Sequence, residues 1–235
     1  CLVGSEMCIE TGADGKGVEF SADIYRESRR LLELVNDIIK LSRLDEGGDK
    51  LERQRVELHA LAENVLANLE SVAEKCHVTL SLTGGAAYVT GVPALLSEML
   101  YNLCDNAIKY NVDGGSVRVD IAQSTAETVL TVSDTGIGIP YAHQSRVFER
   151  FYRVDKSHSK AVGGTGLGLS IVKHAAQYHN ARLELKSAVG KGTEIRIHFP
   201  HATDCLYSVY TQKAYTKGCL LYTSDAADEG LGVDL

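Results

Sequence analysis

The segment Asp134-Thr-Gly136-Ile-Gly138-Ile-Pro140 follows an alternating apolar run that is typical of a β-strand. A carboxylate at a strand end can accept a hydrogen bond from an exocyclic amine, and neighbouring glycines allow a flat ring to lie against bare backbone. An ordinary Asp-Gly turn has the same residues, so this segment alone leaves both interpretations open.

A second glycine-rich segment, Gly163-Gly164-Thr165-Gly166-Leu167-Gly168-Leu169, precedes a predicted helix. Free backbone N–H groups at a helix N-terminus bind anions, and phosphate is the ligand we expect here. The segment is not a P-loop, because it lacks a Gly-Lys-Ser/Thr ending. It is not a dinucleotide fingerprint either, because the G-x-G-x-x-G spacing fails at Ile171.

Polar side chains also lie on the predicted helix 93–111. Asn102 and Asn106 are four residues apart and share a face, where amide oxygens can hold a hydrated Mg²⁺ that bridges phosphates. Lys109 lies one turn further and supplies a counter-charge. Two asparagines on a helix are usually solvated. Here the surrounding apolar residues favour a buried helix with a polar stripe, in which Cys104 belongs to the core rather than acting as a nucleophile.

Together these segments resemble the ATP-binding catalytic domain of sensor histidine kinases of two-component systems. Residues 102–110 (Asn-Leu-Cys-Asp-Asn-Ala-Ile-Lys-Tyr) look like the N box of that family, and residues 134–138 look like its G1 box. Residues 147–153 (Val-Phe-Glu-Arg-Phe-Tyr-Arg) look like the F box, and residues 163–169 look like the G2 box. The boxes follow the family's order and spacing, and the resemblance covers roughly residues 51–200.

The resemblance implies a site for ATP and Mg²⁺. Asp134 would bind the adenine amine, with Gly136 and Gly138 beside the ring. Asn106, together with Asn102, would hold the metal. The remaining implied contacts are Tyr110 near the base, Lys109 and Arg153 on the phosphates, and Gly164, Thr165, Gly166, Leu167, Gly168 and Leu169 closing the phosphate end. Segment 140–164 would be a mobile lid anchored by Phe148 and Phe151.

The sequence also predicts the elements that position these residues. Helical spacing of apolar residues predicts helices over 20–44, 58–72 and 167–178, and alternation predicts strands over 53–57, 78–82, 116–122, 128–134, 182–187 and 193–199. This order fits an α+β fold, a two-layer α/β sandwich with a mixed sheet and helices on one face. By resemblance it is a Bergerat-type ATPase fold.

Helix 20–44 carries apolar residues that recur every seven positions, which suits a helical bundle or a dimer seam; a surface helix of a monomeric domain is the alternative. By resemblance, residues 1–49 are the remnant of a dimerisation hairpin and residues 50–200 are the catalytic domain. Residues 201–218 remain unassigned. Residues 219–235 resemble a translated sequencing-library adapter, with a natural acidic tail as the alternative.

Composition excludes several classes of function. The net charge of the 235 residues is −7, or −3 without the four acidic residues of the adapter-like tail, which argues against nucleic acid as a partner. No stretch approaches the ~18 consecutive apolar residues of a membrane helix. The six cysteines show neither a C-x-x-C pair nor zinc-ligand spacing and read as reduced thiols.

The phospho-accepting histidine is where the sequence departs from the family pattern. In the family, this residue lies on the first hairpin helix and is followed by an acidic residue and shortly by a proline. None of the eight histidines here has these neighbours, so we expect the acceptor to precede Cys1. The parent protein is then expected to be a protein-histidine kinase, whereas this chain binds ATP without phosphorylating itself.

Other members of the same fold are disfavoured. Those that hydrolyse ATP, such as type II topoisomerases, carry a Glu one turn before the metal-binding Asn, where this chain has Asn102. Anti-sigma-factor kinases lack the preceding dimerisation helix. A nucleotide-binding pseudokinase or interaction module remains the non-enzymatic alternative.

The resemblance also implies partners and a location. We expect a response regulator as partner, a homodimer in the intact parent, and a cytoplasmic location. Contact with the bacterial membrane would come only through segments upstream of Cys1.

Overall fold

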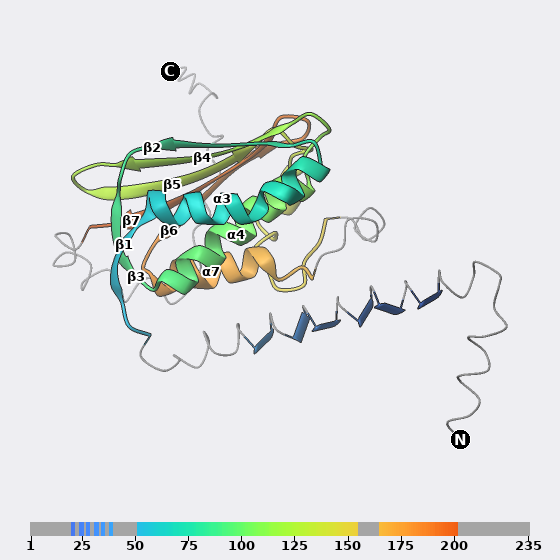
Figure 1. The fold of residues 1–235 in the computed structure, drawn as a ribbon, viewed down its shortest axis with the longest axis horizontal. Helices are drawn as coiled ribbons and strands as arrows, with labels where there is room; N and C mark the ends of the chain where they lie inside the picture. The colour runs from blue at the N-terminus through green and yellow to red at the C-terminus, as the bar shows by residue number, and fades with distance from the viewer. Residues whose placement is uncertain are drawn as a thin grey trace, which may run out of the picture.

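The computed structural model of the chain describes residues 51–154 and 165–201, together with twelve positions between residues 20 and 39. The helices of the main body are α3 (Leu58–Lys75), α4 (Pro93–Lys109), α5 (Tyr141–Gln144) and α7 (Gly168–Tyr178). The strands are β1 (Gln54–Glu57), β2 (Thr79–Gly84), β3 (Tyr88–Gly91), β4 (Ser116–Gln123), β5 (Glu127–Asp134), β6 (Arg182–Ala188) and β7 (Gly192–Pro200). Helices α3, α4 and α7 lie together on one face of the large sheet (Figure 1).

The large sheet has five strands in the order β2-β4-β5-β7-β6. Strands β2 and β4 are parallel, and the other neighbouring pairs are antiparallel. The predicted α+β fold, with a mixed sheet and helices on one face, is therefore confirmed.

Two short elements escaped the sequence analysis. Strand β3 pairs with β1 in a separate two-stranded sheet, so β1 does not belong to the large sheet. Helix α5 lies in segment 140–164, for which the sequence analysis predicted no helix. Each of these elements is four residues long, which is too short for a helical or strand period to be recognised.

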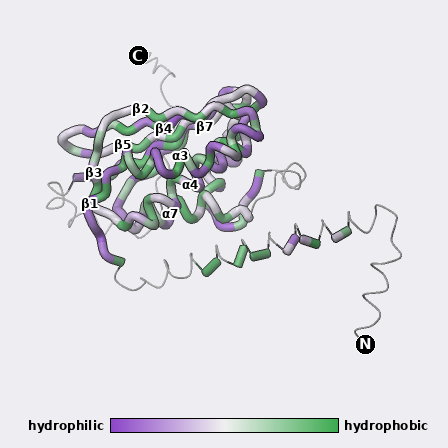
Figure 2. The backbone as a smooth tube through the Cα atoms, viewed as in Figure 1, coloured by the Kyte–Doolittle hydropathy of each residue, from purple (hydrophilic) through white to green (hydrophobic). Residues whose placement is uncertain are grey.

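Side chains on the central strands alternate between a core face and an outer face. Leu130 and Val132 of β5 are buried against the helices, as are Ile195, Ile197 and Phe199 of β7. In Figure 2 the covering helices carry both hydrophobic and hydrophilic stretches, as expected when one side of each helix packs on the sheet.

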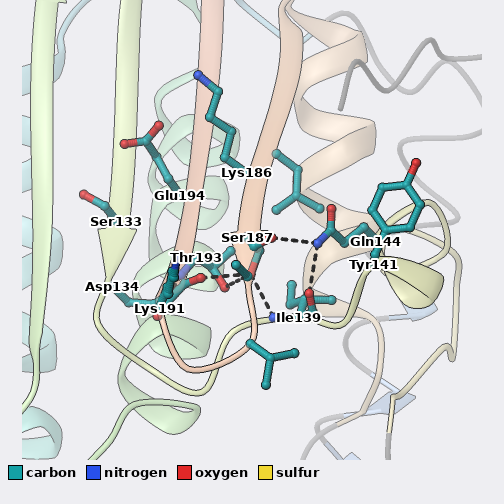
Figure 3. Close-up of a pocket in the computed structure, with 14 residues that line it drawn as sticks. Ser133, Asp134, Ile139, Tyr141, Gln144, Lys186, Ser187, Lys191, Thr193 and Glu194 are labelled. Carbon is teal, nitrogen blue, oxygen red and sulfur yellow. Dashed lines mark hydrogen bonds between the residues drawn. The ribbon is translucent and has the colours of Figure 1, made fainter. Parts of the chain in front are cut away.

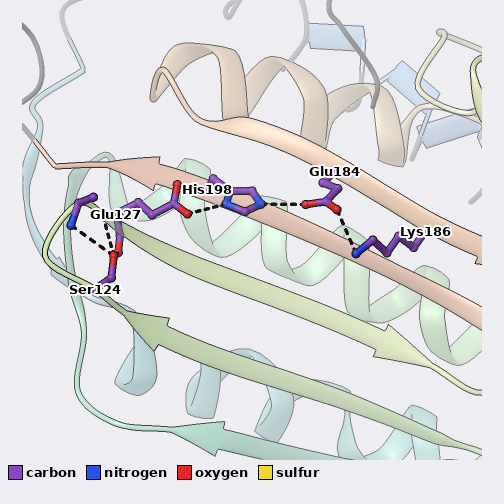
Figure 4. Close-up of polar contacts among 6 residues, drawn as sticks. Ser124, Glu127, Glu184, Lys186 and His198 are labelled. Carbon is purple, nitrogen blue, oxygen red and sulfur yellow. Dashed lines mark hydrogen bonds and ion pairs between the residues drawn. The ribbon is translucent and has the colours of Figure 1, made fainter. Parts of the chain in front are cut away.

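The outer face of the sheet carries a ladder of polar side chains, drawn in Figure 4. His198 of β7 lies between Glu127 of β5 and Glu184 of β6, with ring nitrogens 3.1 Å and 3.2 Å from the two carboxylates. Burial by itself would raise the pKa of Glu184, but hydrogen bonds from Lys186 and His198 outweigh it and lower that pKa. This ladder ties three neighbouring strands together on the face opposite the helices.

The helix ends and interiors follow from local sequence. Glu57 caps α3, because its carboxylate accepts hydrogen bonds from the backbone N–H groups of His59 and Ala60 at 2.8 Å and 2.6 Å. Helix α4 begins at Pro93, as the predicted helix 93–111 does, and proline is favoured in the first turn of a helix. Cys104 on α4 is fully buried, and this burial raises the pKa of its thiol to about 12, so the expectation of a core cysteine is confirmed.

The described positions between residues 20 and 39 are all helical, which agrees with the predicted helix 20–44. Most of its apolar side chains, such as Ile24, Leu31 and Ile38, are exposed, whereas Leu34 packs against Leu167 and Ile171. Among the described residues, no helix combines the length and apolar character needed to cross a membrane. The proposed hairpin turn, the tail 202–218 and the adapter-like tail lie outside the described residues.

Candidate functional site

Asp134 lies at the end of β5, as the sequence predicted, and it belongs to the core face of the sheet. Its Oδ1 accepts hydrogen bonds from the N–H groups of Gly136 (2.8 Å) and Thr193 (3.2 Å). Its Oδ2 has no partner among residues 51–154 and 165–201. Burial raises the pKa of Asp134 more than these two backbone hydrogen bonds lower it. The carboxylate is therefore held in place through one oxygen and leaves the other as an acceptor for a ligand.

The two glycines after Asp134 permit close approach of the backbone. A Cβ on Gly136 would lie 2.3 Å from the carbonyl oxygen of Tyr110, and the N–H of Ile137 donates to that same oxygen at 3.1 Å. Gly138 has φ +70°, and a Cβ there would lie 2.0 Å from the carbonyl oxygen of Ala188. Both contacts require glycine, and they join the segment after β5 to the end of α4 and to the β6–β7 hairpin.

Asn102 and Asn106 lie on α4 against the beginning of α7. A Cβ on Gly168 would lie 2.9 Å from Asn102 Oδ1 and 3.6 Å from Asn106 Nδ2, so this glycine makes room for both amides. The Asn102 amide nitrogen donates to Glu98 O at 2.9 Å, which leaves its oxygen on the Gly168 side. Within the described part of the chain, the half-buried Asn106 amide has no hydrogen-bond partner. The predicted polar stripe is therefore present and faces the glycine-rich segment.

The N-terminus of α7 offers backbone donors. Its N-cap residue, Leu167, makes no side-chain capping hydrogen bond, and the first turn contains no acidic residue. The first N–H groups of the helix are thus available to an anion. Thr165 orders the approach to this terminus, since its Oγ1 accepts from the N–H of Leu167 at 3.2 Å. Gly164 lies outside the described residues.

The F-box segment meets the glycine-rich segment through the backbone. The N–H of Phe151 donates to Gly166 O at 2.9 Å, and Gly166 has φ +73°. Phe148 is buried in the core as predicted for an anchor of the lid. The same prediction for Phe151 is wrong, because its φ of +61° turns the side chain outward and leaves it 59% exposed.

The predicted phosphate-binding cations are placed near these segments. Lys109 lies at the end of α4, and its Nζ is 2.6 Å from Asp105 on the same helix. Tyr110 follows directly and is 41% exposed. Arg153 is half-buried and lies just before the part of the lid that falls outside the described residues. To contact a phosphate, Lys109 must therefore move away from the Asp105 carboxylate.

A hollow of about 650 Å³ opens beside Asp134 at this end of the sheet (Figure 3). Ser187 and Thr193 line it from β6 and β7, and Gln144 lines it from α5. The two asparagines do not line this hollow; they lie on the α7 side of Asp134, against Gly168. The Gln144 amide is buried and donates to Ile139 O at 2.9 Å and to Ser187 O at 2.8 Å.

The sequence analysis missed Ser187, Thr193 and Gln144. A signal for two of them was present, because Thr193 shares the core-facing register of Ile195 and Ile197, and Ser187 shares that of Leu183 and Leu185. A polar residue at a core-facing strand position is costly unless it has a partner. No comparable pattern marks Gln144, since α5 is too short to have one.

His179 is a further missed residue, and it fixes the two helices of the site. Its Nδ1 donates to Ala175 O at 2.7 Å, and its Nε2 accepts from the N–H of Val92 at 3.0 Å, which ties the end of α7 to the start of α4. Only the neutral imidazole can make both bonds. Burial lowers the pKa of His179, and the charge of Arg53 lowers it further.

Comparisons with known proteins agree with this geometry. Residues 91–203 match the family model described as histidine kinase-, DNA gyrase B-, and HSP90-like ATPase. The chain is 35% identical over 187 residues to the sensor-like histidine kinase SenX3 of Mycolicibacterium smegmatis, an alignment that covers 79% of this chain and 48% of that protein.

Two solved structures share the fold. The mycobacterial sensor histidine kinase MprB matches with a TM-score of 0.56 and 29% identity, over 63% of this chain and 97% of the other. Full-length ShkA in complex with AMPPNP matches with a TM-score of 0.67 and 22% identity, over 81% of this chain and 40% of the other.

Residues 91–203 therefore form a domain of the histidine kinase-, DNA gyrase B- and HSP90-like ATPase family. The relatives that the chain matches at 30% identity or more are sensor histidine kinases, and its fold is similar to that of the sensor histidine kinase MprB. It spans less than half the length of the curated sensor kinases that it matches.

Proposed function

We propose that this chain is the ATP-binding catalytic part of a sensor histidine kinase, which transfers the γ-phosphoryl group of ATP to a histidine in a two-component phosphorelay. The observation that carries the proposal is that α4 joins the two ends of the site. The segment after Asp134 is bonded to Tyr110 at the end of α4, and Asn102 and Asn106 of the same helix face Gly168 at the N-terminus of α7. The fold neighbour ShkA, which was crystallised with AMPPNP, supports a nucleotide as the ligand.

The base and the phosphates of the nucleotide bind at two different ends of the site. Asp134 accepts from the adenine amine through Oδ2, while Gly136 allows the backbone after β5 to pack against Tyr110 and so fixes the edge of the ring site. The N–H groups at the start of α7, together with Lys109 and Arg153, meet the phosphates. These groups position and neutralise the triphosphate, which is most of what phosphoryl transfer asks of a protein.

The asparagine pair fits Mg²⁺. The amide oxygens of Asn102 and Asn106 are the hard donors that this ion prefers; the first lies on the Gly168 side, and the Asn106 amide has no partner among the described residues. When bound, the ion would neutralise charge on the phosphate oxygens. Asn102 itself has no basic group that could activate water, so we expect negligible ATP hydrolysis by the chain alone.

The preceding helix supports a role in dimerisation. We propose that residues 1–49 belong to a dimerisation hairpin, that residues 50–200 are the catalytic domain, and that a response regulator receives the phosphoryl group in the cytoplasm. The exposed apolar residues of the helix between 20 and 39 are those a helical bundle would bury, and Leu34 already contacts Leu167 beside the phosphate end.

A second candidate function is nucleotide binding without kinase activity. The observation in its favour is that none of the eight histidines is followed by the acidic residue and proline of the family's acceptor. For this chain we expect ATP binding and no phosphohistidine.

Calorimetric titration of the 235-residue chain with Mg·ATP tests the proposal. We expect Asp134→Asn to weaken ATP binding about 10- to 100-fold, because its amide nitrogen opposes the adenine amine and a charged acceptor is lost. Asp120→Asn is the matched control, since Asp120 lies on the outer face of the sheet and contacts Thr83. Asn106→Ala should reduce the gain in affinity that Mg²⁺ provides.

Absence of ATP binding by the folded wild-type chain would contradict the proposal. Equal losses from Asp134→Asn and Asp120→Asn would contradict the assigned site. An acid-labile phosphoryl group on the chain after incubation with ATP would show that one of its own histidines accepts phosphate.

A further inference from the structure

The Ser187 hydroxyl uses its one proton and both of its lone pairs in hydrogen bonds within the protein. Its hydroxyl accepts from the N–H of Ile139 at 2.8 Å and lies 2.9 Å from both Gly192 O and Thr193 Oγ1. A hydroxyl has one proton to donate and two lone pairs to accept with. Because the carbonyl of Gly192 can only accept, the Ser187 proton goes to it. The contact with Thr193 must then use the proton of Thr193.

This assignment fixes the polarity of the Thr193 hydroxyl. With its proton committed to Ser187, Thr193 Oγ1 offers only lone pairs to a ligand. Its neighbour Asp134, which accepts the Thr193 N–H through Oδ1, also offers only an acceptor at Oδ2. Asp134 Oδ2 and Thr193 Oγ1 therefore both present acceptors to a ligand in the hollow.

The position of Ser187 is itself rigidly held. Ser187 is paired with Thr193 in the β6–β7 ladder. Gln144 donates to the backbone oxygens of both Ser187 and Ile139, which closes a ring of hydrogen bonds around the serine (Figure 3). Rotation of the Ser187 hydroxyl away from this arrangement would leave a half-buried N–H or O–H group without a partner.

We propose that Ser187 is a positioning residue that sets base specificity by holding the proton of Thr193 away from the base. The inference rests on the proposed nucleotide-binding function and adds to it a selection between purines. A 6-amino group donates to both acceptors, whereas a 6-oxo group meets them with its own lone pairs. Ser187 thus makes the site favour adenine over a 6-oxopurine, without touching the base.

The test compares ATP with inosine triphosphate, which has a 6-oxo group and is otherwise close to ATP, by calorimetry on the full chain. In the wild type we expect ATP to bind more tightly. Ser187→Ala frees the Thr193 proton to donate to the 6-oxo group, so the ratio of the dissociation constants, inosine triphosphate over ATP, should fall about tenfold. Ser187→Thr keeps the hydroxyl and should retain the wild-type ratio.

A double-mutant cycle separates this role from a merely structural one. Thr193→Val removes both the acceptor and the proton, so it should weaken ATP more than inosine triphosphate by itself. In that background Ser187→Ala should leave the ratio unchanged within about twofold, because Ser187 acts only through the Thr193 hydroxyl. Thr193→Val also keeps the test decisive if Ser187→Ala fails to fold.

The outcomes distinguish this inference from the proposed function. If the folded wild type binds no ATP, the proposed function is overturned and this inference falls with it. If ATP binds and the ratio is the same in the wild type, Ser187→Ala and Thr193→Val, this inference alone is overturned. A ratio that still falls on Ser187→Ala in the Thr193→Val background would also overturn it.

Discussion

Replacement of His179 by Phe should destabilise the domain through two hydrogen bonds and nothing else. Phe preserves the ring packing of His179, which lies 5.5 Å from Tyr178 and 6.3 Å from Phe199 between ring centroids. It removes the acceptor for the N–H of Val92 and the donor to Ala175 O. The start of α4 and the end of α7 then lose the bond that joins them.

The size of the effect follows from burial. Val92 is buried, and leaving its N–H without a partner costs about 1–3 kcal/mol. The oxygen of Ala175 keeps a second donor, the N–H of His179 at 3.2 Å, so its loss is about 1 kcal/mol. We expect His179→Phe to lower the free energy of unfolding by about 2–4 kcal/mol at pH 8.

The loss of stability caused by His179→Phe should become smaller at low pH. Burial lowers the pKa of His179 below its unfolded value, so the unfolded chain binds more protons. The stabilisation by His179 is complete above about pH 6.5 and is lost as the pH falls from there through the lowered pKa. The difference in the free energy of unfolding between wild type and His179→Phe should therefore be smaller at pH 5.5 than at pH 8, by up to about 1 kcal/mol.

Urea denaturation at pH 8 and pH 5.5 measures the loss of stability and its pH dependence. The other histidines contribute equally to wild type and variant, so their titration does not affect the difference. His59→Phe is the control, because His59 is a partly exposed histidine on α3, and it should change stability by less than about 0.5 kcal/mol. The reasoning fails if His179→Phe costs no more than His59→Phe at pH 8. A difference between variant and wild type that widens at pH 5.5 would refute the direction of the pKa shift.

Three further predictions concern other contacts. Gly138→Ala should cost more free energy of unfolding than Gly114→Ala and should weaken ATP binding, as thermal unfolding and calorimetry would show. Both glycines have φ near +70°, worth about 1–2 kcal/mol, but only Gly138 would also meet Ala188 O, at 2.0 Å. Glu57→Ala should cost about 1 kcal/mol at pH 7. That cost should vanish as the pH falls through the lowered pKa of Glu57, which urea denaturation at pH 7 and pH 3 would measure. ATP affinity should begin to fall at a higher pH than for an ordinary aspartate, because the pKa of Asp134 is raised, and a calorimetric pH series should lose this dependence in Asp134→Asn.

The sequence alone was sufficient for the parts of the site whose chemistry is local. Asn102 and Asn106 share a helix face because of their spacing, and Gly168 opens α7 because a glycine-rich segment precedes a helical period. Asp134 could be placed at a strand end in the same way. Each inference needs only the residues within one element and its boundary.

Contacts between residues on different helices and strands could be found only in the tertiary structure. Ser187 and Thr193 face each other across one hairpin, but Asp134 lies far from both in the sequence and meets them only because β5 and β7 are neighbours in the sheet. The exposure of Phe151 was likewise visible only in the structure, where its backbone has a positive φ and donates to Gly166. His179 finds Val92 because α4 and α7 pack side by side in opposite directions. Periodicity fixes which face of an element is buried, but strand order and register choose the partner, and hydrogen bonds between distant residues are specific to that choice.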